Sequence, residues 1–325
     1  MTINKINQSI IQVSKTLIGI CGFYLIFGLT AILVFNSKPA LARQNSTATQ
    51  LTRSLVVIKG FNMRAMQVHM QLMQSIPHLK WLRDGRTNLF GILFKPENFN
   101  PAHKYPVIED IYAGPQTITV PRSVLDPFYW NFQAVADQGF IVVDIDARGT
   151  PGRGKAFQDA FYGQIGQHEI ADHANVLQEI SKTRPYMDMN RVGVHGHSWG
   201  GYFTLRAMLQ RPDLYKVGVA GAANADLKDF SRAIEAYMGC TPKGCPKAYE
   251  LGSNSRIAGH LKGKLMLMHG TADEDVPFGQ SIKMIKALED NGKSYAFVAF
   301  PGADHMFFSP YWFKRMIDFF KENLK

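Results

Sequence analysis

The sequence predicts an α/β fold, in which a mostly parallel sheet carries helices on both faces. Short apolar runs typical of strands alternate with helical patterns from residue 107 to the C-terminus. The run at residues 140–145 is apolar except for Asp144, as expected of a parallel strand that is buried on both faces. Polar and catalytic residue types follow directly after several of these runs, where open α/β sheets bind ligands.

The expected elements follow one another in a regular order. A hairpin spans residues 81–94 and turns at Asp84-Gly85, a pair that favours tight hairpin turns. Strands are expected at residues 107–112, 140–145, 191–195, 217–222, 265–268 and 295–300. Helices are expected at residues 128–137, 168–182, 201–209, 277–290 and 309–323. On the helix at 168–182, His168 and Asp172 share a face beside His173, and we interpret this face as solvated rather than metal-binding.

The N-terminal region differs from the rest of the chain. Lys5 and Lys15 precede Leu17–Phe35, a run of 19 residues without a charge, and Ala40-Leu41-Ala42 has the form of a cleavage site. We expect an export signal at residues 1–42, a helical or linker extension at 43–78 and a catalytic domain at 79–325. The expected location is periplasmic or extracellular. The alternative is an uncut membrane anchor with the catalytic domain outside the cytoplasm, because 19 apolar residues nearly span a bilayer.

Cysteine usage agrees with export. Removal of residues 1–42 would remove Cys21 and leave Cys240 and Cys245, five positions apart. In an oxidising compartment this pair is expected to form a disulfide, and free thiols are the alternative. Two thiols with no nearby histidine at ligand spacing do not predict a zinc site.

The charge does not indicate a nucleic-acid partner. The formal net charge is +10, but the sequence has no basic run with interleaved aromatic residues. It also lacks a P-loop, a dinucleotide-binding fingerprint and an H-E-x-x-H motif. We therefore expect no cofactor and no metal ion, and a membrane partner only if the N-terminal segment is uncut.

Ser198 is the candidate nucleophile. It lies between Gly196 and Gly200 in GVHGHSWGGYF, directly after a strand-like run and before a helical pattern. In this context a G-x-S-x-G sequence forms a sharp turn that exposes the serine hydroxyl at the top of a sheet. The alternative is that the glycines only permit a tight turn.

A nucleophilic serine needs a base, and the base needs an acid that orients it. Asp273, Glu274 and Asp275 follow the strand at 265–268, and His305 follows the last strand. The chain order serine, acid, histidine is that of α/β-hydrolases. Several carboxylates compete for the role of the acid.

Six sequence blocks together resemble the catalytic domain of the prolyl oligopeptidase family, close to its dipeptidyl-peptidase and acylaminoacyl-peptidase branches. In chain order they are KYPVIEDIYAGP, DARGTPGRG, GHSWGG, AYMG, HGTADEDVP and PGADH. The resemblance extends from about Leu79 to the C-terminus and implies an α/β-hydrolase fold. It implies Asp273 as the acid, the Tyr112 hydroxyl and the Trp199 backbone N–H as oxyanion donors, and a structural role for Arg148.

Two features depart from the family pattern. The family normally carries a β-propeller before its hydrolase domain, and residues 43–78 are too few for one, so we expect none. The segment at residues 226–233 lacks the tyrosines that line the proline pocket of the dipeptidyl branch, and Phe230 is the one candidate to replace them, so the resemblance does not imply proline specificity.

The sequence therefore predicts an exported serine hydrolase, and a serine-type peptidase acting through an acyl-enzyme on Ser198 is the leading hypothesis. A carboxylesterase with the same catalytic residues is the alternative, and an inactive binding module of the same fold is the third hypothesis. The expected partner is a peptide or a small ester substrate, and the sequence leaves an oligomer open.

Overall fold

The computed structural model describes residues 79–81, 87–120, 127–229 and 233–325, all within a unit that extends from Met70 to Lys325. The predicted signal segment, the extension at 43–78 and the turn at Asp84-Gly85 lie outside the described residues. Within the described ranges, no helix is long and apolar enough to cross a bilayer.

An eight-stranded sheet forms the centre of this unit, with the strand order β1-β2-β4-β3-β5-β6-β7-β8. The strands are β1 (Leu79–Trp81), β2 (Thr87–Phe94), β3 (Tyr105–Asp110), β4 (Ile141–Asp146), β5 (Met187–His197), β6 (Tyr215–Gly221), β7 (Lys264–Gly270) and β8 (Ala296–Phe300). The first two strands pair antiparallel, and β2 pairs antiparallel with β4. All other neighbouring strands pair parallel. The prediction of a mostly parallel sheet is confirmed.

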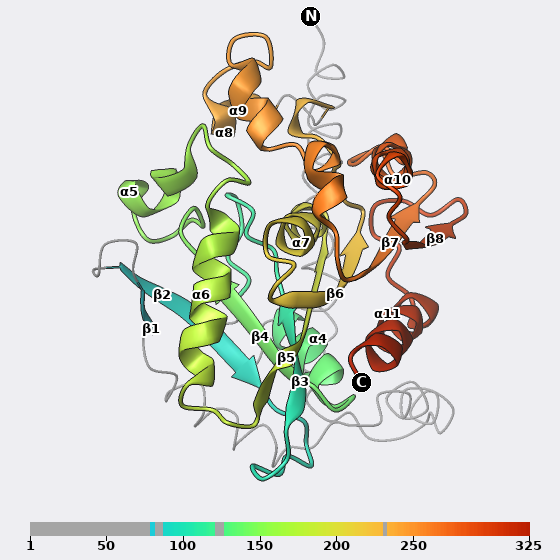
Figure 1. The fold of residues 1–325 in the computed structure, drawn as a ribbon. Coiled ribbons are helices and arrows are strands. Elements are labelled where there is room, and N and C mark those ends of the chain that lie inside the picture. Colours follow the sequence, from blue (N-terminus) through green and yellow to red (C-terminus); the bar gives the residue numbers. More distant parts are fainter. Residues whose placement is uncertain (1–78, 82–86, 121–126, 230–232) are drawn as a thin grey trace, which may run out of the picture. The chain divides into compact units, whose positions relative to one another are not determined.

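Helices cover both faces of the sheet, as predicted. The described α-helices are α4 (Pro127–Ala136), α5 (Lys155–Gln158), α6 (Glu169–Ser181), α7 (Trp199–Gln210), α8 (Ala233–Met238), α9 (Pro246–Leu251), α10 (Gly279–Asp290) and α11 (Pro310–Asn323). Three short 3₁₀ segments are η1 (Asp159–Phe161), η2 (Leu227–Asp229) and η3 (Ser255–His260). In Figure 1, α6 and α7 lie in front of the sheet and α4 lies behind it.

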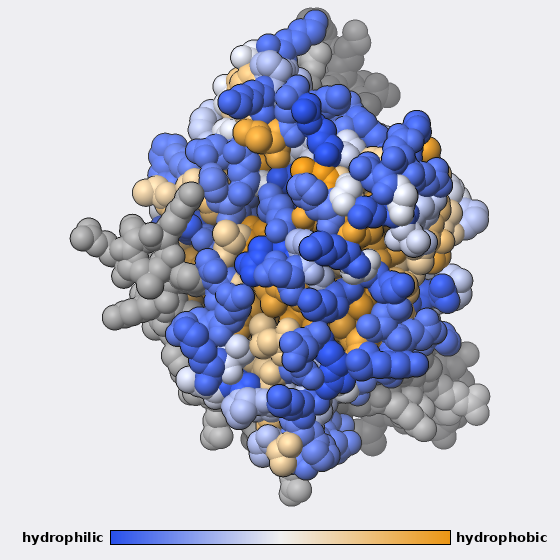
Figure 2. Space-filling view, in the orientation of Figure 1, coloured by the Kyte–Doolittle hydropathy of each residue, from blue (hydrophilic) through white to orange (hydrophobic). Residues whose placement is uncertain are grey.

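The sheet separates two hydrophobic cores, because successive side chains of each strand point to opposite faces. Val107 of β3 packs in one core with side chains of α6 and α7, whereas its neighbour Ile108 packs in the other with side chains of α4 and α11. Successive strand side chains point to opposite faces, so an all-apolar strand supplies both cores. Full burial of each such side chain stabilises the fold by about 1.5–3 kcal/mol. Hydrophilic residues cover most of the outer face seen in Figure 2, with small hydrophobic areas between them.

One expectation about α6 is wrong. Asp172 and His173 do not lie on a solvated face, because both are buried. Asp172 accepts two hydrogen bonds from Arg148, at 2.8 and 2.7 Å, which fixes the loop after β4 against α6. Nδ1 of His173 lies 2.7 Å from Oε1 of Glu109 inside the core. Burial lowers the pKa of His173, but the Glu109 carboxylate outweighs it and raises the pKa above its ordinary value.

Candidate active site

Ser198 occupies the corner between β5 and α7. Its backbone has φ 61° and ψ −117°, a conformation that residues with a side chain rarely adopt. Strain of this kind costs about 1–3 kcal/mol and is kept where the surrounding structure enforces it. The Ser198 N–H donates to the carbonyl of Gly221 at 2.9 Å, which ties the corner to the end of β6. The predicted strand, sharp turn and helix are all present.

The two glycines of the motif allow close packing around this corner. A Cβ atom at Gly196 or at Gly200 would lie 2.2 Å from the carbonyl oxygen of Ile111, closer than any real contact. The start of α7 therefore lies directly against the segment that follows β3. That segment carries Tyr112, so the glycines bring Ser198 and Tyr112 into one neighbourhood.

His305 and Asp273 meet at the ends of β8 and β7. Nδ1 of His305 lies 2.8 Å from Oδ2 of Asp273. Of the three carboxylates expected to compete, Asp273 is therefore the one that binds His305, rather than Glu274 or Asp275. The hydrogen bond to Nδ1 leaves the other ring nitrogen, Nε2, as the atom that can exchange protons with a nucleophile.

Asp273 is held in its ionised form. Its side chain is fully buried, and burial alone would raise its pKa. Hydrogen bonds from His269, His305 and the Val276 N–H outweigh burial and hold the pKa of Asp273 well below its usual range. Oδ1 accepts from the backbone N–H groups of Asp275 and Val276, at 3.0 and 2.8 Å.

His269 supports Asp273, a contact that the sequence did not reveal. Its Nε2 lies 3.2 Å from Oδ2 of Asp273 and 2.9 Å from the Val276 carbonyl, so Nε2 carries the hydrogen. Nδ1 of the same ring lies 2.7 Å from the Ser281 hydroxyl and accepts from it. The sequence signal that could have found it is position: His269 directly follows the predicted strand at 265–268 and lies four residues before Asp273.

The serine corner and the His305 loop are in contact. The ring of His197, directly before Ser198, lies 4.8 Å from the ring of His305, measured between centroids. Among the described residues the Ser198 hydroxyl makes no hydrogen bond, and its side chain is half-buried. Catalytic hydrogen bonds are often long until a substrate binds, so the arrangement is compatible with proton transfer between Ser198 and His305.

Tyr112 and Trp199 both lie against Gly114, close to Ser198. A Cβ atom at Gly114 would lie 2.7 Å from the Tyr112 ring and 3.1 Å from Cβ of Trp199, so this position has room only for a residue without a side chain. Ala113 has φ 51°, which makes the sharp turn after Tyr112. The Tyr112 oxygen accepts a hydrogen bond from the Gln116 amide at 2.9 Å.

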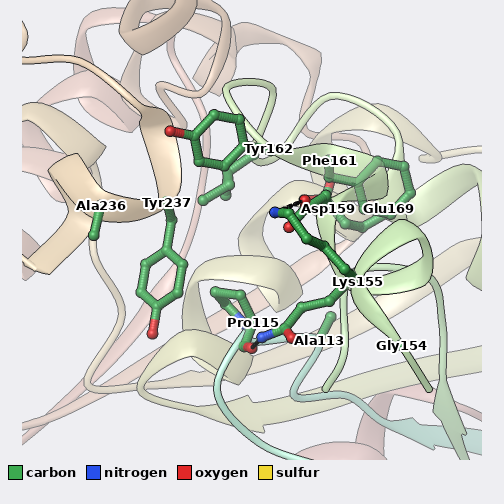
Figure 3. Close-up of a pocket in the computed structure, with 13 residues that line it drawn as sticks. Ala113, Pro115, Gly154, Lys155, Asp159, Phe161, Tyr162, Glu169, Ala236 and Tyr237 are labelled. Carbon is green, nitrogen blue, oxygen red and sulfur yellow. Dashed lines mark hydrogen bonds and ion pairs between the residues drawn. The ribbon is translucent and has the colours of Figure 1, made fainter. Parts of the chain in front are cut away.

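A pocket of about 450 Å³ opens beside these two residues. Its lining residues are Ala113, Pro115, Gly149, Gly154, Lys155, Gln158, Asp159, Phe161, Tyr162, Ile165, Glu169, Ala236 and Tyr237. Figure 3 shows Tyr162 and Tyr237 on one side of the pocket, and Lys155 and Asp159 side by side on the other. The Tyr237 ring meets the Trp199 ring edge-on at 6.4 Å, so the pocket borders the serine corner.

Cys240 and Cys245 form a disulfide, with their Cα atoms 6.1 Å apart. The bridge follows α8, the helix that carries Tyr237. The Tyr249 hydroxyl donates to the Cys240 carbonyl at 2.8 Å and secures the same loop against α9.

The fold and this corner define the class of the protein. An α/β sheet with a strained serine between a strand and a helix, and a histidine–aspartate pair on later strand ends, is the arrangement of an α/β-hydrolase. Residues 127–325 match the prolyl oligopeptidase family. The chain belongs to this family of serine peptidases.

Named relatives agree with the assignment. The chain is 34% identical to human dipeptidyl peptidase 8 over 244 residues, which cover 73% of the chain and 27% of the relative. It is 32% identical to a probable dipeptidyl-aminopeptidase B of Emericella nidulans over 220 residues, 66% of the chain and 24% of the relative. The chain thus spans about a quarter of the length of these curated relatives.

A solved structure shows the same fold. A putative dipeptidyl aminopeptidase IV from Bacteroides ovatus superposes with a TM-score of 0.69 and 32% identity, over 74% of this chain and 34% of that chain.

Proposed function

We propose that this protein cleaves peptide bonds through an acyl-enzyme on Ser198, with His305 as general base and Asp273 as its orienting acid. The observation that carries the proposal is the hydrogen bond between His305 and Asp273, beside a serine in a strained conformation. The relatives are named dipeptidyl peptidases and dipeptidyl-aminopeptidases, which supports peptide substrates.

In this proposal each step belongs to one residue. Oγ of Ser198 attacks the substrate carbonyl carbon while Nε2 of His305 takes the hydroxyl proton. Asp273 stabilises the resulting imidazolium through Nδ1. The Tyr112 hydroxyl and the Trp199 N–H donate to the oxyanion. His305 returns the proton to the leaving amine as the C–N bond breaks. A water molecule then gives a proton to His305 and attacks the acyl carbon, and His305 returns that proton to Oγ of Ser198 as the ester C–O bond breaks.

Parallel assays of aminoacyl anilides and short-chain nitrophenyl esters test this proposal. We expect turnover of both substrates by the purified chain, because a site that expels an amine also expels a better leaving group. Ser198→Ala should abolish both activities. Turnover of esters alone would instead support the carboxylesterase hypothesis, and turnover of neither would support the inactive binding module.

We also propose that the protein works outside the cytoplasm. The Cys240–Cys245 disulfide supports this, since such bonds persist in oxidising compartments. The apolar run before Ala40-Leu41-Ala42 supports it independently. Amino-terminal sequencing of the native protein from cell fractions tests the proposal: a start at Arg43 in a fraction outside the cytoplasm is expected. An intact N-terminus in the cytoplasm would contradict export, and an intact N-terminus in the membrane fraction would support the anchor.

A further inference from the structure

The ring of His197 packs among three aromatic rings beside the catalytic site. Its centroid lies 4.8 Å from that of His305, 5.0 Å from that of Phe307 and 4.6 Å from that of Phe308. All three contacts are inclined, at 55°, 64° and 56°, and the contact with Phe307 has the edge-to-face geometry that aromatic pairs prefer. The residue before the nucleophile is therefore part of the wall around His305.

The surrounding structure fixes this ring in place. Gly221 lies opposite His197 in the parallel pairing of β5 and β6, and a Cβ atom there would lie 2.9 Å from Nδ1 of His197. The glycine thus leaves the space that the ring fills. Phe307 stacks on Phe300 at 4.8 Å, and Phe308 meets Trp312 of α11 at 4.8 Å, so the wall is anchored to β8 and α11.

Both ring nitrogens of His197 are buried, although the residue as a whole is only half-buried. Neither of its ring nitrogens has a hydrogen-bond partner among the residues that the structure describes. The titratable groups that act on it are His305 after β8, His195 earlier on β5 and Asp273 after β7. Burial, followed by the two histidines, lowers the pKa of His197 well below its ordinary value, and Asp273 and the nearby backbone of His305 oppose this only in part. The ring is therefore neutral at neutral pH.

We propose that His197 is a positioning residue, whose uncharged ring holds the plane of the His305 imidazole between Asp273 and Ser198. This inference rests on the proposed function. The bond to Asp273 fixes one nitrogen, but the direction of Nε2 also depends on rotation of the ring, and a packed wall restricts that rotation. A neutral neighbour also adds no repulsion when His305 takes the proton of Ser198 and becomes a cation.

Substitutions of His197 test the inference with the anilide substrate. His197→Ala should lower kcat by about 10²-fold, the effect of a small misplacement of a catalytic group, with little change in KM. His197→Phe restores a flat ring and should keep kcat within a few-fold of the parent. Because His197 is neutral, the acid limb of the kcat/KM profile should lie at the same pH in His197→Phe and in the parent.

His195→Ala is the matched control. His195 lies two residues earlier on the same strand, is buried, and contacts Trp312 and the Val219 carbonyl. We expect this variant to lose stability but to keep most of kcat. His197→Leu is a second variant that fills most of the volume without a flat ring, and its kcat should fall while the chain remains folded by circular dichroism.

If the parent is active and His197→Ala and His197→Leu are equally active, the inference is overturned but the proposed function is not. An equal loss of kcat in the His195→Ala control, or a shifted acid limb in His197→Phe, would overturn it in the same way. A parent that turns over neither anilide nor ester would contradict the proposed function itself, and this inference with it.

Discussion

The backbone at Ser198 shows how a few residues enforce an unfavourable conformation. A φ of 61° is unfavourable for serine, and the flanking glycines remove the side chains that would block the turn. The Gly221 carbonyl accepts the Ser198 N–H and fixes the result. Several residues around the corner together hold Ser198 in this conformation, which explains why the motif contains several small residues.

Tyr112→Phe tests the oxyanion assignment. The Tyr112 hydroxyl is proposed to donate most strongly once negative charge has formed, so its removal should lower kcat by about 10²-fold and change KM less. Steady-state kinetics on the anilide would measure this. Gln116→Ala, which removes the side chain that donates to the same oxygen, is the control and should have a smaller effect. Equal kcat in Tyr112→Phe and the parent would leave the oxyanion to backbone donors.

Sequence reasoning proposed residues for the site but did not predict their surroundings. The residue types, the chain order and the resemblance together selected Ser198, Asp273, His305, Tyr112 and Trp199. The supporting contacts of His269 and His197 were not predicted, because they depend on which strand ends become neighbours in space. A histidine next to a nucleophile carries no sequence signal that separates a packed ring from an exposed one.

At the scale of elements, periodicity predicted the long segments and missed the short ones. The expected strands and long helices match the structure to within a few residues, except that β5 begins earlier, at Met187. The helices α5, α8 and α9 have four to six residues, too few to show a helical period. The wrong expectation for α6 has a physical cause: the buried Glu109 that binds His173 lies 64 residues away in the chain.

Removal of the Cys240–Cys245 disulfide should destabilise the loop between α8 and α9. A bridge that closes so short a loop stabilises a protein by about 2 kcal/mol in the chain-entropy account. The Cys240→Ser/Cys245→Ser double variant should therefore lose roughly that free energy of unfolding, measured by urea denaturation. KM for the anilide should also rise, because α8 presents Tyr237 to the pocket. Unchanged stability on removal of both cysteines would contradict this account.

On the scale of the whole molecule, the part of the chain that the structure describes contains every predicted site residue. Those residues come from the ends of β3, β5, β7 and β8, which lie at one edge of the sheet because the strands are parallel. The sheet therefore assembles residues that are distant in sequence. The relatives are much longer, with 27% and 24% of their lengths matched, so their substrate preferences do not transfer directly.

The central claim is that Ser198 is the nucleophile, and covalent labelling tests it most directly. The intact chain is treated with a fluorophosphonate probe, digested and mapped by mass spectrometry. We predict a single adduct on Ser198, formed in step with the loss of anilide turnover, and no adduct on a folded Ser198→Ala variant. An adduct on another residue, or more than a few per cent of parent turnover in Ser198→Ala, would contradict the account.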